Sequence, residues 1–175
     1  MSGREKPQES PSQTAGPYLH IGCTPNVAGV SGVYDEDLGV TTQTKNSSFL
    51  EIRIFDGDGN PVTDAMVELW ADSISFWARA VHDEERDIYP FFVPVVAKGE
   101  SGNVVSNISV WIVARGINLG LHSRIYFPEN DNSSDPVLGL VEPSRQSTLL
   151  AQKHDKGYRF DIHLQGEDET VFFDV

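Results

Sequence analysis

Cysteine is nearly absent from this chain of 175 residues, which contains only Cys23. A lone cysteine forms no intrachain disulfide and cannot supply a cysteine-rich metal site. The fold must therefore rest on packing, and a chain of this length can bury a sufficient core without such staples. Hydrophobic residues make up 39% of the sequence and three residues are tryptophan, which indicates a globular rather than a disordered protein.

Basic residues are scarce relative to acidic ones. The chain has 13 Lys and Arg against 26 Asp and Glu, which gives a formal net charge of −13. Proteins bind nucleic acid largely by neutralising its phosphates with Lys and Arg. We therefore expect this protein to bind neither nucleic acid nor anionic membrane surfaces. The charge still permits a local basic pocket for an anionic ligand.

Long hydrophobic runs are missing as well. No segment approaches the ~20 apolar residues of a transmembrane helix. The first ten residues, MSGREKPQES, lack the apolar core of a secretory signal. We therefore expect a cytoplasmic protein, in which the glycosylation sequons at Asn46, Asn107 and Asn132 are chance matches.

Helical periodicity is almost absent, and short segments with strand patterns take its place. In Phe49–Phe55, for example, apolar residues alternate with Glu51 and Arg53. Further strands are expected at Ala65–Trp70, Phe76–Val81, Ile88–Val96, Ile108–Ala114, His122–Phe127, Tyr158–Leu164 and Thr170–Asp174. Only Ser147–Lys153 is expected to form helical turns. The sequence therefore predicts an all-β fold, a single β-sandwich of mixed or antiparallel strands with long loops. Residues 1–13 form an N-terminal arm and residues 14–175 the domain.

The stretch Asn107–Phe127 is the expected centre of the sandwich. Both faces of its first strand are mostly apolar, so we expect the strand to lie between two packed layers. Arg115 follows directly at the end of this strand. A buried arginine is costly unless it meets a charge or an acceptor, so Arg115 needs a partner.

The motifs for chemistry are weak. Asp56–Asn60 mimics the start of a calcium loop, but Pro61 and Val67 stand where the loop needs Gly and Glu, which favours a hairpin turn. Asp161 and His163 share one strand face, as two metal ligands or, more simply, as an exposed acid–imidazole pair. His122 is expected to be structural. No nucleophile elbow, phosphate loop or zinc motif is present, so these patterns alone leave the function open.

Four segments together carry a family resemblance: Ser12–Gly22, Val113–Phe127, Asp135–Glu142 and Tyr158–Val175. They resemble the alpha chains of protocatechuate 3,4-dioxygenases, which belong to the intradiol ring-cleaving dioxygenases. Phe55–Trp70 is similar to the family's early sandwich strands. The resemblance implies a relation to β-sandwich enzymes that hold a non-haem ferric ion by two tyrosines and two histidines. These enzymes use O2 to split an ortho-dihydroxybenzene between its hydroxyl-bearing carbons.

The resemblance also implies a division of labour, because in the two-chain enzymes the beta chain holds the iron. Asn107 and Ser109 stand where an iron-holding chain has its His-x-His pair. The segments matched to the two tyrosine ligands, Phe91–Gly99 and Ala71–Ala80, contain no tyrosine. The resemblance therefore implies no metal in this chain, with Fe(III) held by a partner beta chain in a hetero-oligomer.

The substrate-binding residues implied by the resemblance lie in two places. Thr14, Ala15, Gly16 and Pro17 match a loop that lines the partner's pocket, where a Gly–Pro bend lets the backbone approach a flat ring. Arg115 matches an arginine near the substrate, where it would balance the substrate carboxylate or pair with a beta-chain acid. Tyr18 next to the loop lines the entrance or packs inside the chain.

The expected function is that of the alpha subunit of such an enzyme. It would help to cleave protocatechuate to 3-carboxy-cis,cis-muconate, in aromatic catabolism, only together with the iron-bearing beta chain. One alternative is a non-catalytic scaffold or an aromatic-acid-binding subunit. Another is a self-sufficient metalloenzyme using Asp161 and His163. The region around residues 71–90 is shorter than in relatives, which bears on the partner interface.

Overall fold

The structure, a computed structural model, describes residues 14–16, 18–35, 37, 39–71, 74–94 and 107–174. Within these residues the chain forms strands β1 (Ser47–Phe55), β2 (Met66–Ala71), β3 (Phe76–Val81), β4 (Tyr89–Pro94), β5 (Asn107–Val113), β6 (Leu121–Tyr126), β7 (Gln152–His154) and β8 (Gly157–His163). The helical elements are α1 (Tyr18–Cys23) and the 3-10 turns η2 (Asn132–Ser134), η3 (Leu138–Leu140) and η4 (Gln146–Leu149). No helix in the described ranges is long and apolar enough to cross a membrane.

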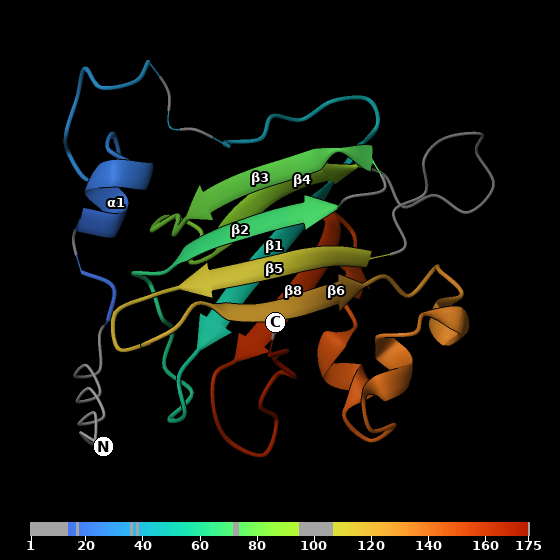
Figure 1. The fold of residues 1–175 in the computed structure, drawn as a ribbon. Helices are drawn as coiled ribbons and strands as arrows, with labels where there is room; N and C mark the ends of the chain where they lie inside the picture. The colour runs from blue at the N-terminus through green and yellow to red at the C-terminus, as the bar shows by residue number, and fades with distance from the viewer. Residues whose placement is uncertain are drawn as a thin grey trace, which may run out of the picture.

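Two four-stranded sheets face each other, in the orders β4-β1-β8-β7 and β3-β2-β5-β6 (Figure 1). Neighbouring strands run antiparallel, except that β1 and β8 pair in parallel with Leu50 opposite Tyr158. The predicted β-sandwich of mixed strands is therefore confirmed. The predicted arm, residues 1–13, lies outside the described residues, so the division into arm and domain stays a prediction.

The core lies between the sheets and is built by strand alternation. Leu50, Ile52 and Ile54 of β1 point inward with at most 2% of their surface exposed, and Ile108, Val110 and Ile112 of β5 meet them from the other sheet with none. Alternate residues of a strand point to opposite faces, which explains this pattern. Because β5 is anchored in this core, its two ends are fixed in position: Asn107 begins the strand, and Arg115 follows its other end.

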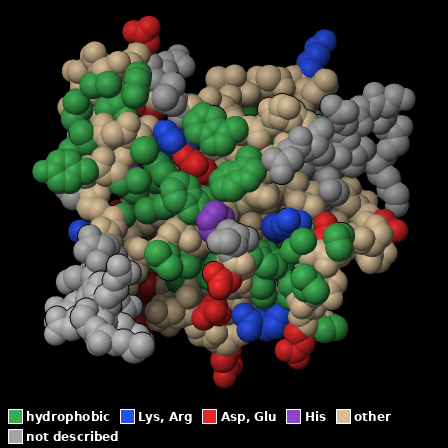
Figure 2. Space-filling view, viewed as in Figure 1, with side chains coloured by type: hydrophobic (Ala, Val, Ile, Leu, Met, Phe, Trp, Pro, Cys, Tyr) green, Lys and Arg blue, Asp and Glu red, His purple; other side chains and the backbone are tan. Residues whose placement is uncertain are grey.

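The outer row of β5 differs from the prediction. Ser109, Trp111 and Val113 are only half-buried, so β5 is fully covered on one side alone and does not lie between two packed layers. Hydrophobic side chains gather on this outer face of the sheet (Figure 2), where β2 and β3 contribute Trp70 and Trp77. The outward-facing apolar residues of β5 belong to a hydrophobic surface patch. An apolar outer face has the same sequence pattern whether it is exposed or packed against a second layer, so the pattern alone could not decide.

One predicted strand is wrong. Thr170–Asp174 is not a strand and makes one bridge, between Phe173 and His122. Its hydrogen bonds go elsewhere, since Val171 N–H donates to Thr148 Oγ1 and Thr170 pairs with the backbone of His163. The helical turns predicted at Ser147–Lys153 are present in part: one 3-10 turn, η4, forms and is followed by the edge strand β7. The prediction that no other segment is helical is wrong, because α1 forms at Tyr18–Cys23.

The connection between β1 and β2 is the predicted turn. Asp56 Oδ1 accepts hydrogen bonds from the N–H groups of Asp58 and Asn60, at 2.9 and 2.8 Å. These bonds stabilise the charged form and lower the pKa of Asp56. The turn does not form a simple hairpin, however, because β1 and β2 belong to different sheets. It leads directly into Thr63 and Asp64 at the end of the sandwich where Arg115 lies.

Candidate functional site

Arg115 follows the C-terminal end of β5 and finds its partner within the chain. Its Nη2 lies 3.0 Å from Asp64 Oδ2, in the connection between β1 and β2. The arginine side chain is 80% exposed and the aspartate side chain 39%. The prediction that Arg115 needs a charged partner holds, but burial is not the reason, because the guanidinium projects into solvent. An exposed pair of this kind contributes little stability, about 0–1 kcal/mol.

The loop at Thr14 is fastened to the same place. The backbone N–H of Gly116 donates a 2.6 Å hydrogen bond to Thr14 Oγ1. Gly116 has φ +86°, a conformation that glycine adopts without strain. The structure therefore brings together two of the predicted substrate-binding places, Thr14 and Arg115. Pro17, the last residue of the predicted loop, lies outside the described residues.

A small recess opens between these elements, which we call the Arg115 recess. Its lining residues come from the loop, from α1 and from the two strand ends: Ala15, Gly16, Leu19, His20, Asp64 and Arg115. Its volume is about 200 Å³, whereas pockets that enclose a ligand hold about 300–1,000 Å³. The recess can cover part of a small molecule and is too small to enclose one.

The sequence singled out neither Asp64 nor, next to it in the recess, His20. Its Nε2 lies 3.1 Å from the backbone carbonyl oxygen of Asp64, and its Nδ1 lies 3.2 Å from Thr24 Oγ1. Asp64 therefore meets His20 through its main chain and Arg115 through its side chain. His20 stands within the resembling segment Ser12–Gly22, but no spacing links it to residue 64. Only the fold does.

Tyr18 does not pack inside the chain. Its side chain is 83% exposed at the start of α1. The expectation that it packs within this chain is therefore wrong. The same ring stays free to cover a ligand or a partner beside the Arg115 recess.

Asn107 and Ser109 lie half-buried on the outer face of β5, at the end of the strand away from Arg115. Asn107 Nδ2 donates to Asp135 Oδ2 at 3.0 Å, and Tyr126 OH donates to Asp135 Oδ1 at 3.0 Å. Ser109 stands opposite Arg124, whose Nη1 is 4.0 Å from Asp135 Oδ2. The two positions matched to histidine ligands therefore border a cluster organised by a carboxylate.

Asp135 is held in its charged form. Burial opposes ionisation, but hydrogen bonds from the Leu138 N–H, the Tyr126 hydroxyl and the Val137 N–H keep its pKa below the ordinary value. Burial, and then the bond to Asp135, raises the pKa of Tyr126 to about 12. Tyr126 is thus a neutral phenol that donates a hydrogen bond to a carboxylate, not a tyrosinate available to a ferric ion.

The donors at this end of β5 do not fit Fe(III). An amide engaged with a carboxylate and a serine hydroxyl are not the imidazoles that a ferric site of this type requires. Within the ranges that the structure describes, no three His, Cys, Asp or Glu residues lie together in a way that could hold a metal.

The alternative metal pair is also engaged elsewhere. Arg53 Nε donates to Asp161 Oδ1 at 2.7 Å, and its Nη2 bonds the second oxygen. The ring of His163 instead stacks on Phe55, with centroids 5.2 Å apart. Asp161 and His163 therefore serve two different contacts and do not point at a shared ion. The ring centroid of His122 lies 6.3 Å from that of Trp70 and 6.2 Å from that of Trp111. These packing contacts agree with the structural role expected for His122.

Comparison with known proteins places the chain in a family. The protocatechuate 3,4-dioxygenase alpha chain of Pseudomonas putida is 34% identical over an alignment of 194 residues, covering 95% of this chain and 96% of that protein. This chain belongs to the family of protocatechuate 3,4-dioxygenase alpha chains. The alpha chain of Burkholderia cepacia is 32% identical over 193 residues, covering 96% of this chain and 98% of that one. No protein-family model matches the chain.

Solved structures show the same fold. Hydroxyquinol 1,2-dioxygenase from Pseudomonas putida superposes with a TM-score of 0.51 at 12% identity, covering 84% of this chain and 72% of that one. The dioxygenase domain of a carbohydrate-binding fusion protein from a Streptomyces species gives 0.50 at 19% identity, covering 75% and 86%. The resemblance of this chain to the protocatechuate 3,4-dioxygenase alpha-chain family is thus confirmed, and its sandwich is one that dioxygenases use.

Proposed function

We propose that this protein is the alpha subunit of a cytoplasmic protocatechuate 3,4-dioxygenase. With an iron-bearing beta chain, it would cleave protocatechuate with O2 to 3-carboxy-cis,cis-muconate. The identity to alpha chains over nearly the whole length supports the assignment. The observation that carries the site is the hydrogen bond from Gly116 N–H to Thr14 Oγ1, which joins the predicted pocket loop to the turn after Arg115.

The iron belongs in the partner under this proposal. The positions matched to histidine ligands hold Asn107 and Ser109, and Asn107 is bound to Asp135. Fe(III) bound by the beta chain would supply the activation of the dihydroxybenzene ring toward O2. This chain would contribute a wall of the pocket and one positive charge.

The Arg115 recess suits such a contribution because it is incomplete by itself. The side chains of Ala15 and Gly16 are minimal, so a flat ring can approach the backbone of this segment closely. Arg115 stands at the rim with its guanidinium exposed, so a carboxylate on a bound ring can replace or share the contact with Asp64. The recess and a matching surface of the partner would together enclose the substrate and exclude water from it.

The assignment is tested by co-expression with a beta chain that carries intact Tyr and His ligands. We expect the two chains to co-purify, and we expect consumption of protocatechuate and O2 only when both are present. A complex that assembles but loses no activity when Thr14 and Arg115 are both changed to alanine would favour the scaffold alternative. A beta chain that is fully active without this chain would contradict the proposal.

A further inference from the structure

A second concave surface lies on the outer face of the β4-β1-β8-β7 sheet. It is a groove of about 590 Å³ whose walls include Phe49, Phe92, Arg53, Arg86, Lys156 and Arg159. We call it the cationic groove. Its volume lies within the roughly 300–1,000 Å³ of small-molecule sites. None of its lining residues belongs to the Arg115 recess.

The groove gathers more basic side chains than the acidic surface of the protein would suggest. Four cationic side chains line it against two carboxylates, Glu51 and Asp87, while the whole chain has a formal net charge of −13. A protein with this excess of acid repels anions over most of its surface. Asp161 and Asp83, which are not among the lining residues, pair with Arg53 and Arg86. An anion can therefore bind in the groove at a cation that these pairs leave free.

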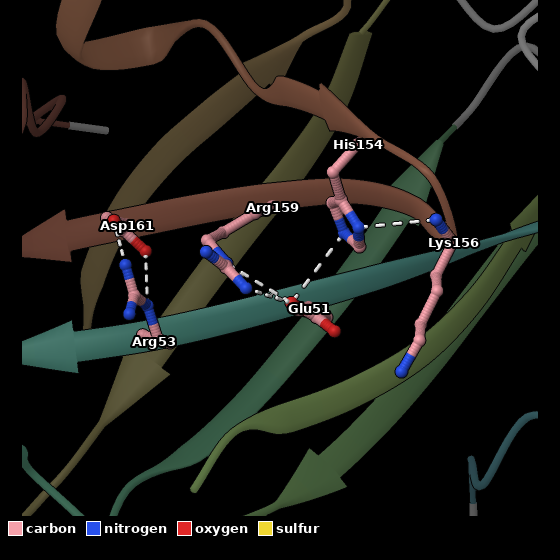
Figure 3. A network of polar contacts seen from close by, with 6 residues as sticks. All are labelled: Glu51, Arg53, His154, Lys156, Arg159 and Asp161. Atoms are coloured by element: carbon pink, nitrogen blue, oxygen red, sulfur yellow. Dashed lines mark hydrogen bonds and ion pairs between the residues drawn. The ribbon is translucent and has the colours of Figure 1, made fainter. Parts of the chain in front are cut away.

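Two of the cations are already engaged. Arg53 forms a two-point ion pair with Asp161, its register partner on β8. Arg159 donates from both Nε and Nη2 to the same oxygen, Glu51 Oε2, at 3.2 and 3.0 Å. These pairs form the floor of the groove (Figure 3). They hold both guanidinium groups in place, since planar forks are fixed by such contacts.

His154 completes the surroundings of Glu51. Its Nδ1 accepts a hydrogen bond from the Lys156 N–H at 3.3 Å. Its Nε2 is buried and lies 3.6 Å from Glu51 Oε2, without a hydrogen-bond partner among the described residues. Glu51 Oε2 accepts two hydrogen bonds from Arg159, and this guanidinium compensates the negative charge of Glu51.

Lys156 is the cation left over. Its Nζ has no ion-pair or hydrogen-bond partner among the described residues, and Figure 3 shows it extended away from the floor network. The β7–β8 turn that carries Lys156 is fastened to His154 through the backbone N–H. Arg86 adds a second weakly engaged cation, 3.4 Å from Asp83 and 65% exposed.

An aromatic wall stands beside these charges. Phe49 and Phe92 face each other across β1 and β4, with centroids 5.3 Å apart and planes tilted by 48°. Both rings are half-buried and line the groove. A ring that lies against them buries apolar surface, while its anionic substituent reaches the cations.

We propose that the cationic groove binds a small aromatic carboxylate. The ring lies against Phe49 and Phe92, and the carboxylate is directed to Lys156 and Arg159. The inference does not depend on the proposed function, because no residue of the Arg115 recess takes part in it.

The test uses the full chain and 4-fluorobenzoate, followed by 19F NMR of the ligand. We expect saturable binding with a Kd on the order of 1 mM, which weakens as NaCl is raised. Lys156→Met is expected to weaken binding by at least about fivefold, and Lys156→Arg to retain it. Lys153→Met is the matched control, since Lys153 lies three residues before Lys156, in β7, but pairs with Glu129 and does not line the groove.

Two further measurements separate this site from others. Cyclohexanecarboxylate and inorganic phosphate should each compete less well than benzoate, because the first lacks an aromatic ring and the second lacks any ring. Arg115→Ala should leave binding unchanged. Thermal unfolding of each variant confirms that it is folded, and Phe92→Leu provides a second, uncharged change that should also weaken binding.

The proposal is overturned if 4-fluorobenzoate shows no saturable binding, or if Lys153→Met lowers it as much as Lys156→Met. Phosphate that competes as well as benzoate would show a general anion site, which also overturns it. Binding abolished by Arg115→Ala would move the ligand to the Arg115 recess. That result would overturn the proposal that the cationic groove is the binding site, but it would not contradict the proposed function.

Discussion

Gly116 donates its backbone N–H to Thr14 Oγ1 across 2.6 Å, joining residues 102 positions apart in the chain. The bond fixes the loop that precedes α1 against the turn that follows β5. Arg115 lies next to Gly116 in that turn and reaches Asp64 with its side chain. This one hydrogen bond therefore positions the backbone of the loop relative to the guanidinium of Arg115. The geometry depends on a threonine hydroxyl at position 14.

Thr14→Val tests this dependence. Valine has nearly the same shape but cannot accept the hydrogen bond, so the exposed Gly116 N–H would turn to water. The loss is worth about 1 kcal/mol, and we expect roughly a fivefold rise in KM for protocatechuate in the assembled enzyme, with a smaller change in kcat. Steady-state O2 consumption measures both constants.

Thr42→Val is the control for this variant, because Thr42 is exposed in the loop before β1 and lies outside the recess. It should leave KM unchanged. Equal KM values for Thr14→Val and the unaltered enzyme would show that the loop does not need this bond to hold its position.

Strand alternation and turn residues were sufficient to predict most of the sandwich. Residues 76–81 are a strand with the predicted bounds, and β1, β2, β5, β6 and β8 differ by at most two residues at either end. These strands alternate or are continuously apolar, so burial of one face decides their structure. Thr170–Asp174 has a similar composition, yet its backbone N–H groups bond to three separate acceptors, Thr148 Oγ1 and the carbonyl oxygens of His163 and His122, and form no ladder. Such long-range competition has no local signal.

The site residues also divide into those that the sequence could predict and those that it could not. Thr14 and Arg115 could be found from their place in resembling segments, and the fold brings them together. Asp64 and His20 could not, because their contacts join a turn and a short helix 44 positions apart. The 6-residue α1 is too short to show helical periodicity. The outer face of a sheet is equally hard to assign, since Trp111 looks like a core residue in the sequence.

Asp135→Asn tests the cluster beside Asn107. The amide keeps one acceptor oxygen but loses the charge that Tyr126, Asn107 and two backbone N–H groups surround. We expect the free energy of unfolding to fall by about 1–3 kcal/mol near neutral pH. Urea unfolding at fixed pH measures the change.

The pH dependence of the same variant gives an independent check. The folded pKa of Asp135 is lowered, so its contribution to stability is present above the unfolded pKa of about 3.9 and is lost as pH falls through the folded value. Asp135→Asn should therefore lose less stability than the unaltered chain on acidification below about pH 4. A parallel decline in both proteins would show that Asp135 is not held in its charged form.

Gly120→Ala tests the packing of the outer sheet face. A Cβ at Gly120 would lie 1.9 Å from Trp111 Nε1, so the indole must move from its present position against His122. We expect a loss of about 1–3 kcal/mol of stability and a lower Tm. Gly139→Ala is the matched control, because no atom lies within 4 Å of its added Cβ and the change should be within about 0.5 kcal/mol. Similar Tm values for both variants would mean that Trp111 is free to shift.

Iron analysis tests the assignment of the metal to the partner. The donors at Asn107 and Ser109 do not suit Fe(III), so the chain purified alone should contain no stoichiometric iron, while the complex with a beta chain should contain one equivalent per pair. Metal analysis by mass spectrometry of both preparations measures this. Stoichiometric iron in the isolated chain would contradict the placement of the metal. Treatment of the complex with a chelator should abolish turnover without unfolding this chain.

The pair Arg115 and Asp64 makes the sharpest prediction for the site. If a substrate carboxylate and Asp64 compete for the same guanidinium, Asp64→Asn frees Arg115 and should lower KM for protocatechuate about twofold. Arg115→Ala should raise KM roughly tenfold, equal to about 1.4 kcal/mol. Arg115→Lys should recover part of that loss, since a point charge replaces a fork.

The double variant decides whether the two effects share one cause. Asp64→Asn should have no effect on KM once Arg115 is alanine, because the carboxylate then has no cation left to compete for. Lys45→Ala, at an exposed cation in the loop before β1, controls for general charge. If Asp64→Asn changes KM equally with and without Arg115, Asp64 acts independently of the guanidinium. If Arg115→Ala instead dissociates the complex while KM of the remaining enzyme is unchanged, Arg115 pairs with a carboxylate of the partner and not with the substrate.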